Sequence, residues 1–124
     1  IMVSGSKIPK IKITSNIKEA SSKITKYNLG LAIIMKNNIV QGILTDGDAR
    51  RSLRYNLKSQ SLTKIMTPNP LFISENSTAS KALAIMNKKK ITSLLVTSEN
   101  SLNKKNKKLI GIVHIHSILK FGIK

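Results

Sequence analysis

The segment "GILTDGDARR" contains the only two aspartates of a chain that has five acidic residues against 22 Lys and Arg. Asp46 and Asp48 stand next to Thr45 and are followed by Arg50 and Arg51. A threonine hydroxyl can donate to a phosphate, and arginines can add charge-assisted hydrogen bonds. Carboxylates suit a ribose better than a phosphate, because they accept hydrogen bonds from neighbouring hydroxyl groups. The residue types therefore indicate a site for a ligand that carries both groups.

The same segment has a second interpretation, in which an aspartate only caps a helix. An apolar run ends at Leu44 and a helical pattern follows, so the segment lies where a strand runs into a helix. The free backbone N–H groups of a helix start, with the positive end of the helix dipole, form a ready anion site. Asp46 or Asp48 can also cap such a start, which is worth about 1 kcal/mol. The residues alone leave capping and ligand binding both open.

His114 and His116 are the only histidines, and they stand at the end of another apolar run, "LIGIVHIH". Side chains two residues apart on a strand point to the same side. A zinc site needs a third ligand such as Asp, Glu or another His, so we expect no metal site and no other cofactor. Packing or hydrogen bonding at the strand end is one remaining interpretation. Contact with an acidic ligand, favoured when a histidine is protonated, is the other.

The chain as a whole is strongly basic, with a net charge of +17. Clustered Lys and Arg bind phosphate backbones, so a nucleic-acid-binding protein is one functional class to weigh. Most of the excess charge is lysine, however, and aromatic residues for base stacking make up only 3% of the chain. We therefore interpret the lysines mainly as solvated surface, including "KKK" at 88–90 and the loop "NKKNKK" at 103–108. We expect no specific nucleic-acid partner.

Several functional classes lack the residues that they need. The absence of cysteine excludes disulfides and thiolate metal sites, and it is compatible with a reducing compartment. No apolar run approaches the ~20 residues that span a bilayer, so we expect a cytoplasmic protein without a membrane partner. The sequence contains no evident nucleophile–base pair, Walker or Rossmann glycine motif, or acid/base carboxylate dyad. We assign no catalytic residue.

The two halves of the chain repeat one pattern. Ala20 falls on Ala82 and Ile24 on Met86 at a shift of 62 residues, and "GILTDGD" falls on "GIVHIHS" at a shift of 69. The shift grows because the second copy has seven extra residues in "SENSLNKKNKK". That stretch lies between two apolar runs, where a connection on the surface tolerates insertion.

Each copy predicts a strand, a helix, two more strands and a closing helix. The first strands are "KIKI" and "LFI", and the closing helices are "DARRSLRY" and "HSILKF". Between them lie the strand pairs "LAIIM" with "IVQGIL" and "SLLV" with "KLIGIV". The first helix of the second copy has apolar residues at helical spacing from Ala79 to Met86. The capping residues that we expect ahead of it are Ser74, Asn76 and Ser77.

The sequence therefore predicts an α/β (α+β) fold of two β-α-β-β-α repeats. A unit of about 55 residues is marginal alone, so we expect the repeats to pack with pseudo-two-fold symmetry, their strands lining a shared cleft. The expected boundaries are 9–58 for the first repeat, 59–69 for a linker and 70–124 for the second repeat.

The tandem repeat, with Thr-x-x-Asp at the end of the last strand, resembles a pair of CBS (cystathionine β-synthase-type) domains, a Bateman module. "GILTDGDARR", "IMTPNP", "KKITSLLV" and "GIVHIHSILKFG" are similar to the C-terminal half of bacterial arabinose-5-phosphate isomerases. Those enzymes feed the synthesis of Kdo, the eight-carbon sugar acid of lipopolysaccharide. The opening "IMVSGSKIPKI" is similar to that family's junction between isomerase domain and CBS pair, so we expect residues 1–8 to be a linker from a missing N-terminal isomerase domain. The departures are Val3, Ala49 and Ser117, where the family usually has His, Leu and Asp.

The resemblance implies a regulatory module that binds a nucleotide or nucleotide sugar between its repeats and forms homo-oligomers through them. Catalysis would belong to the isomerase domain, and this chain alone would have no activity. The resemblance implies a phosphate role for Thr45 and a ribose role for Asp48. Thr92 and Ser93 join the candidates because the matching strand start in this fold faces the cleft. The candidate ligand-binding residues are Thr45, Asp46, Asp48, Arg50, Arg51, Thr92, Ser93, His114 and His116.

The second copy lacks the phosphate-plus-ribose pair, because His114 stands for Thr45 and Ser117 for Asp48. Two unequal halves indicate one asymmetric ligand. CMP-Kdo, the downstream product in that family's pathway, joins a nucleotide to an acidic sugar and has this asymmetry. A general sensor of AMP or ATP that uses Thr45 and Asp48 is the first alternative, and a basic nucleic-acid-binding protein is the second.

Overall fold

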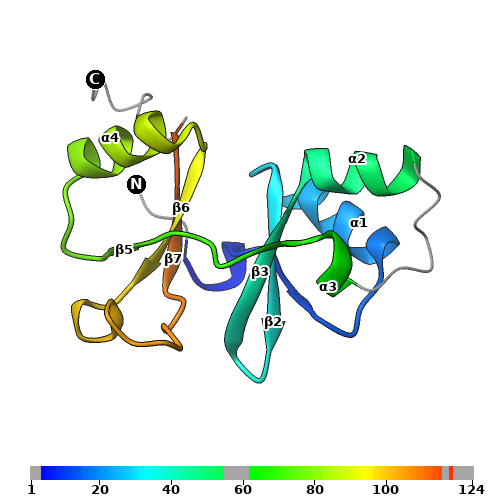
Figure 1. The fold of residues 1–124 in the computed structure, drawn as a ribbon, viewed down its shortest axis with the longest axis horizontal. Coiled ribbons are helices and arrows are strands. Elements are labelled where there is room, and N and C mark those ends of the chain that lie inside the picture. The colour runs from blue at the N-terminus through cyan, green and yellow to red at the C-terminus, as the bar shows by residue number, and fades with distance from the viewer. Residues whose placement is uncertain (1–3, 55–61, 116–117, 119–124) are drawn as a thin grey trace. The chain divides into compact units, whose positions relative to one another are not determined.

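The computed structural model describes residues 4–54, 62–115 and 118. The chain divides into two compact units, of which the first is Ser6–Pro70 and the second contains Leu71–Lys124 (Figure 1). Each unit has its own sheet and its own apolar core. The short 3-10 helix η1 (Gly5–Lys7) precedes the first strand. None of the helices in the described ranges is long and apolar enough to cross a membrane.

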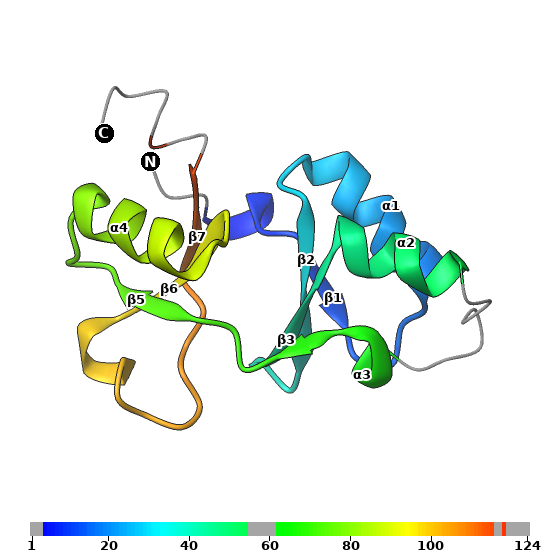
Figure 2. The same ribbon diagram turned by 45° about the horizontal axis from the view of Figure 1, so that its top comes forward.

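The first unit is a four-stranded sheet with helices packed on it. Its elements are β1 (Lys10–Lys12), α1 (Ile17–Tyr27), β2 (Leu31–Lys36), β3 (Ile39–Thr45), α2 (Asp46–Arg54), α3 (Leu62–Ile65) and β4 (Thr67–Pro68). The strand order is β1-β2-β3-β4, with β1 parallel to β2 and the other pairs antiparallel. Figures 1 and 2 show α1 and α2 side by side on one side of this sheet.

The second unit repeats this arrangement with three strands. Its elements are β5 (Phe72–Ser74), α4 (Ala79–Lys89), β6 (Ser93–Thr97), the 3-10 helix η2 (Glu99–Ser101) and β7 (Gly111–His114). The order is β5-β6-β7, with β5 parallel to β6 and β7 antiparallel to it. The expected closing helix "HSILKF" falls mainly outside the described residues. The predicted mixture of helices and strands is confirmed in both units.

The strand registers confirm the internal repeat that the sequence indicates. In the first sheet Gly42 pairs with Ile34, and in the second Gly111 pairs with Val96. These pairs obey the shift of 62 residues on one strand and 69 on the next. The parallel strands β1 and β5 follow the same shift of 62 against their partners. The two copies therefore share their hydrogen-bonding pattern as well as their apolar positions.

The helix starts match in the same way and correct one prediction. Asn16 caps α1, where its side chain accepts a hydrogen bond of 2.8 Å from the N–H three residues on. At the shift of 62, Thr78 caps α4 with the equivalent bond at 3.1 Å. The expectation that Ser74, Asn76 or Ser77 caps this helix is therefore wrong. The chain turns through those residues after β5, and only Thr78 has its hydroxyl beside the free N–H groups.

The aligned apolar positions form the two cores. Ala20 and Ile24 are buried in the first core, and their counterparts Ala82 and Met86 are buried in the second. The remaining buried members of the first core are Ile11, Ile17, Ala32, Ile34, Leu44, Ala49 and Leu62. Those of the second core are Ile73, Leu83, Leu94, Val96 and Ile118. Aliphatic side chains build both, as the low aromatic content requires.

Part of the expected linker belongs to the first unit's structure. Leu62 at the start of α3 is fully buried in the first core. β4 then pairs with β3 at Gly42. A Cβ on this glycine would lie 2.6 Å from the Thr67 carbonyl oxygen and 2.8 Å from the Met66 sulfur. Only a residue without a side chain lets β4 approach β3 so closely.

Candidate functional site

The predicted site lies where β3 runs directly into α2. The Thr45 hydroxyl accepts a hydrogen bond of 3.1 Å from the Asp48 N–H. In return, Oδ2 of Asp48 accepts a bond of 3.1 Å from the Thr45 N–H. This reciprocal pair is a capping box, with aspartate in the position often taken by glutamate. Helix capping is therefore a role that the structure shows for both residues.

The Asp48 carboxylate has two further partners. An Nη of Arg51, three residues along α2, donates to Oδ1 of Asp48. Oδ2 also lies 3.4 Å from the hydroxyl of Thr67, which comes from β4. The Asp48 side chain is only 8% exposed, whereas that of Arg51 is 64% exposed. A buried carboxylate is thus stabilised by a backbone N–H, an arginine and the positive end of the helix dipole.

The first turn of α2 retains one backbone donor. The Asp46 N–H donates to the Gly30 carbonyl at 3.0 Å, and the Asp48 N–H is used by Thr45. The N–H of Gly47 is left without an acceptor in the described part of the chain. A Cβ on Gly47 would stand 3.6 Å from an Nη of Arg51 and 3.7 Å from the Thr45 hydroxyl. A hydroxyl, a guanidinium and a helix-start N–H therefore gather around Gly47, which is the donor set of an anion site.

Asp46 and Arg50 form a separate ion pair on the surface. Their side chains are 59% and 74% exposed, with 3.0 Å between the nitrogen and the oxygen. An exposed pair at this helical spacing contributes a few tenths of a kcal/mol. Of the five candidates in "GILTDGDARR", the structure thus brings Thr45, Asp48 and Arg51 together. The other two bond to each other.

The candidates of the second unit lie at the corresponding sheet end. Ser93 at the start of β6 pairs with His114 at the end of β7, as Leu31 pairs with Thr45 in the first sheet. The hydroxyl of Ser93 is buried and has no hydrogen-bond partner among the described residues. The side chain of Thr92 is exposed.

Two positions needed to complete this comparison, His116 and Ser117, lie outside the described residues. The metal question can be followed only in part for the same reason. Within residues 4–54, 62–115 and 118, no three His, Cys, Asp or Glu side chains group as metal ligands would.

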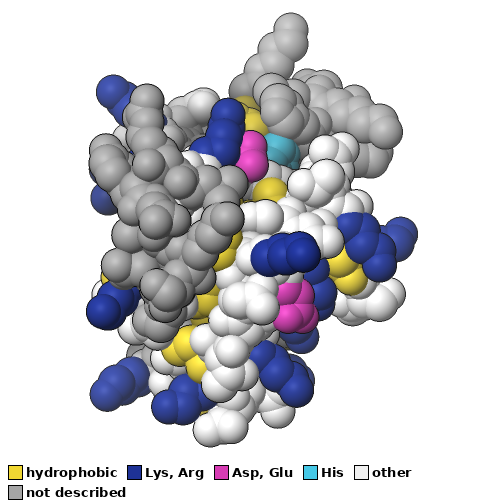
Figure 3. All heavy atoms as spheres, turned by 90° about the vertical axis from the view of Figure 1, so that its right-hand side faces the viewer, with side chains coloured by type: hydrophobic (Ala, Val, Ile, Leu, Met, Phe, Trp, Pro, Cys, Tyr) yellow, Lys and Arg dark blue, Asp and Glu magenta, His cyan; other side chains and the backbone are white. Residues whose placement is uncertain are grey.

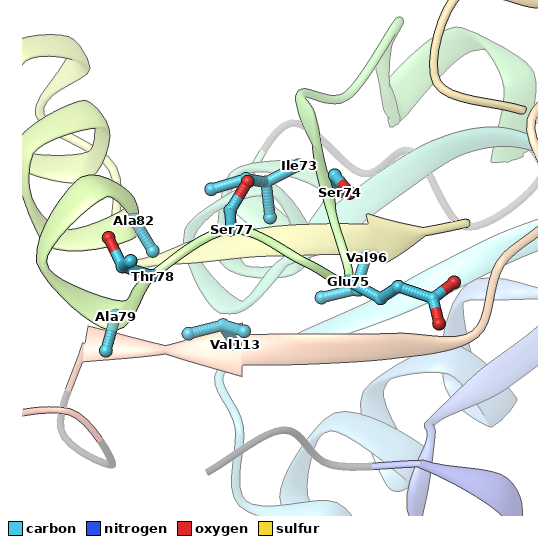
Figure 4. Close-up of a pocket in the computed structure, with 9 residues that line it drawn as sticks. All are labelled: Ile73, Ser74, Glu75, Ser77, Thr78, Ala79, Ala82, Val96 and Val113. Carbon is cyan, nitrogen blue, oxygen red and sulfur yellow. The ribbon is translucent and has the colours of Figure 1, made fainter. Parts of the chain in front are cut away.

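The second unit also contains a cavity of about 200 Å³ that involves none of the predicted site residues (Figure 4). Ala79 and Ala82 of α4 face Val96 and Val113 of the sheet across it, while the Glu75 carboxylate points away from both alanines. The lining residues are Ile73, Ser74, Glu75, Ser77, Thr78, Ala79, Ala82, Val96 and Val113. With no Lys or Arg in the lining and one carboxylate at the rim, the cavity does not suit a phosphate.

The basic residues are distributed over the surface. Figure 3 shows one face, on which Lys and Arg side chains stand in separate groups with small patches of Asp and Glu among them. Lys88, Lys89 and Lys90 at the end of α4 are exposed. Separate groups of lysine are typical of a solvated surface, whereas nucleic-acid binding is favoured by a continuous basic stripe.

Sequence reasoning missed Gly47 and Thr67 as parts of the site. Gly47 stands inside the quoted motif, but only the structure shows its N–H without an acceptor. Thr67 lies 19 residues from Asp48, in a segment expected to be a linker. The one signal that marked it was the resemblance of "IMTPNP" to a known family, which carries no information about a contact with Asp48.

The family model described as "CBS domain" matches residues 1–55 and 62–124. The chain therefore belongs to the CBS domain family, as a tandem pair, and the resemblance seen in the sequence is confirmed. The two matched segments correspond to the two repeats whose registers agree in the structure.

Curated relatives narrow the similarity. The chain is 32% identical over 126 aligned positions to arabinose 5-phosphate isomerase KdsD of Escherichia coli K12, covering 99% of this chain and 36% of that protein. It is 37% identical over 126 positions to KdsD of Francisella tularensis, covering 100% of this chain and 37% of that protein. An uncharacterized protein of Rickettsia prowazekii, RP505, is 34% identical, covering 99% of this chain and 37% of that protein. The chain thus spans little more than a third of the length of these relatives.

Solved structures agree on the fold. The CBS domain pair of protein MJ0100, in complex with 5′-methylthioadenosine and S-adenosyl-L-methionine, has a TM-score of 0.81 at 21% identity, covering 97% of this chain and 91% of that chain. CBSX2 in complex with AMP has a TM-score of 0.79 at 17% identity, covering 98% and 91%. The CBS-domain protein ATU1752 of Agrobacterium tumefaciens has a TM-score of 0.79 at 22% identity, covering 94% and 90%. At these identities the likeness establishes the fold alone.

Proposed function

We propose that this chain is the regulatory ligand-binding CBS pair of an arabinose-5-phosphate isomerase that serves Kdo and lipopolysaccharide biosynthesis. The supporting observation is its 32% and 37% identity to two KdsD proteins along essentially its whole length. Since it spans about 36% of such proteins, catalysis belongs to a separate isomerase domain. The purified 124-residue chain should not turn over arabinose 5-phosphate. Measurable turnover would refute this division of labour.

The ligand of the first unit is a nucleotide or nucleotide sugar. Its phosphate would meet the Thr45 hydroxyl, the Gly47 N–H and the Arg51 guanidinium, which gather at the start of α2. Its ribose hydroxyls would donate to the Asp48 carboxylate. Phosphate at a helix start and hydroxyls on a carboxylate satisfy both partners with charge-assisted bonds.

CMP-Kdo is the form of this ligand that we favour. The position of Thr45 is taken by His114 in the second repeat, and that of Asp48 by Ser117, so the two halves offer different chemistry. A nucleotide at one half and an acidic sugar near Lys, Arg and His side chains would use both. In calorimetric titrations CMP-Kdo should therefore bind more tightly than CMP.

Matched variants test the one-sided site. Asp48→Ala should weaken binding of CMP-Kdo by about 1–3 kcal/mol, because it removes the acceptor of the ribose hydroxyls. Ser117→Ala, at the aligned position, should weaken it far less. Circular dichroism must show that both variants remain folded. Equal losses from the two substitutions would contradict the asymmetry.

A general adenine-nucleotide sensor is the second candidate, because CBS structures with the same fold are described in complex with AMP and with S-adenosyl-L-methionine. Competition titrations separate the two. If AMP or ATP displaces CMP-Kdo at lower concentration than CMP does, the adenine sensor replaces the first proposal. Salt-dependent binding to arbitrary DNA, without saturable nucleotide binding, would contradict both.

A further inference from the structure

The Asp48 carboxylate is fully engaged before any ligand arrives. Its Oδ2 accepts from the Thr45 N–H at 3.1 Å and lies 3.4 Å from the Thr67 hydroxyl. Its Oδ1 is occupied by Arg51. A carboxylate offers about four acceptor positions on its two oxygens, and with the side chain 8% exposed the free ones are covered. A ribose can therefore reach this group only if one of the partners leaves.

The three partners are not equally free to leave. The Thr45 N–H belongs to the backbone at the strand–helix junction, and the bond it makes is half of the capping box. Thr67 is held in β4 by its pairing with β3. Arg51 is attached through a long side chain that is 64% exposed. An ion pair with one exposed member contributes little and is readily exchanged.

The place to which Arg51 would move is also defined. An Nη of its guanidinium already stands 3.6 Å from the position of a Cβ on Gly47, with the Thr45 hydroxyl 3.7 Å from the same point. A phosphate beside the Gly47 N–H would lie within reach of this guanidinium after only a small rotation of the side chain. Arginine pairs with phosphate through two parallel hydrogen bonds, which favours the new partner over a single carboxylate oxygen.

We propose that Arg51 is exchanged between Asp48 and the ligand's phosphate, so that the site selects nucleotides over nucleosides. In the free protein Arg51 occupies Oδ1 of Asp48; in the complex the ribose occupies Oδ1 and Arg51 binds the phosphate. A nucleoside displaces Arg51 without offering it a new partner. This inference deepens the proposed nucleotide site and rests on it.

Arg51→Met tests the exchange, because it removes the guanidinium and keeps a side chain of similar length. Calorimetric titration with the pair cytidine and CMP, and with adenosine and AMP, covers both candidate bases. The variant should bind the nucleoside about 2–5-fold more tightly, since the competitor for Oδ1 is gone. It should bind the nucleotide at least about 10-fold more weakly, since a charge-assisted phosphate contact is lost. The two affinities thus move in opposite directions.

Lys18→Met is the charge-matched control, because Lys18 is exposed on α1 of the same unit and removes one positive charge elsewhere. It should change every affinity less than about 2-fold. Equal weakening of nucleoside and nucleotide by Arg51→Met, in a variant that melts like the wild type, would overturn the exchange while leaving the nucleotide site standing. If the wild-type chain binds neither CMP nor AMP, the proposed function fails first, and the exchange with it.

Discussion

Filling the cavity of the second unit is a direct test of how the two repeats differ. Ile17 begins α1, is 4% exposed and packs in the first core. The shift of 62 residues places Ala79 at this position in the second repeat. Ala79 lines the cavity of about 200 Å³. The substitution Ala79→Ile puts back the side chain that the first repeat uses, and we expect it to stabilise the protein.

The magnitude follows from three added carbon atoms. Burial of each contributes about 0.8 kcal/mol, or about 2.4 kcal/mol if all three leave water. Ordering the isoleucine side chain costs about 0.5–1 kcal/mol, and its lower helix propensity costs about 0.4 kcal/mol. The net gain is about 1 kcal/mol, which raises the Tm by about 3–5 °C for a chain of this size.

Thermal and urea denaturation followed by circular dichroism measure this gain. Ala84→Ile is the matched control, because Ala84 lies on the exposed side of the same helix and the chemical change is identical. It should lose a few tenths of a kcal/mol through helix propensity alone. If Ala79→Ile is less stable than Ala84→Ile, the added carbons are strained instead of buried, and the reasoning from the repeat is wrong at this position.

Three further predictions concern the first unit and use urea denaturation. Gly42→Ala should destabilise by about 1–3 kcal/mol, because its Cβ would lie 2.6 Å from a backbone oxygen of β4; Gly47→Ala, with no neighbour closer than 3.6 Å, is the control, and equal losses would contradict the close approach. Asn16→Ala should cost about 1 kcal/mol through loss of the α1 cap, and Asn16→Asp should restore most of it; no loss would remove the cap's role. Asp48→Ala should cost about 1–2 kcal/mol, because it ends the capping box and strands the Thr45 N–H; Asp46→Ala should cost less than about 0.5 kcal/mol, and the opposite order would contradict the assignment of the cap.

The fold was accessible from the sequence because one pattern occurs twice. Apolar residues at Ala20 and Ala82, or at Ile34 and Val96, face the same layer of the core in each copy, and a strand that slips by one residue would expose its whole apolar set. Any two aligned positions therefore fix the register of all the strands. The register pairs in the structure obey the same two shifts that the aligned letters give.

The details of the candidate site were less accessible, because they depend on hydrogen-bond geometry. Four hydroxyl or amide residues precede α4, and composition does not decide which of them caps it; applying the shift of 62 to Asn16 would have selected Thr78. The contact between Thr67 and Asp48 depends on how β4 returns along β3. No periodicity in the sequence encodes that path, and the glycine that permits it, Gly42, reads equally well as part of the site motif.

The two oxygens of Asp48 separate what the sequence left as alternatives. Oδ2 serves the fold, because it accepts from the Thr45 N–H and completes the capping box. Oδ1 is bound only by an exposed arginine, so a ligand can take it without opening the helix start. Capping and ligand binding therefore do not exclude each other at this residue. It follows that the loss of binding in Asp48→Ala contains a contribution from folding. A variant of Arg51 changes the second oxygen alone and reports on the ligand site by itself.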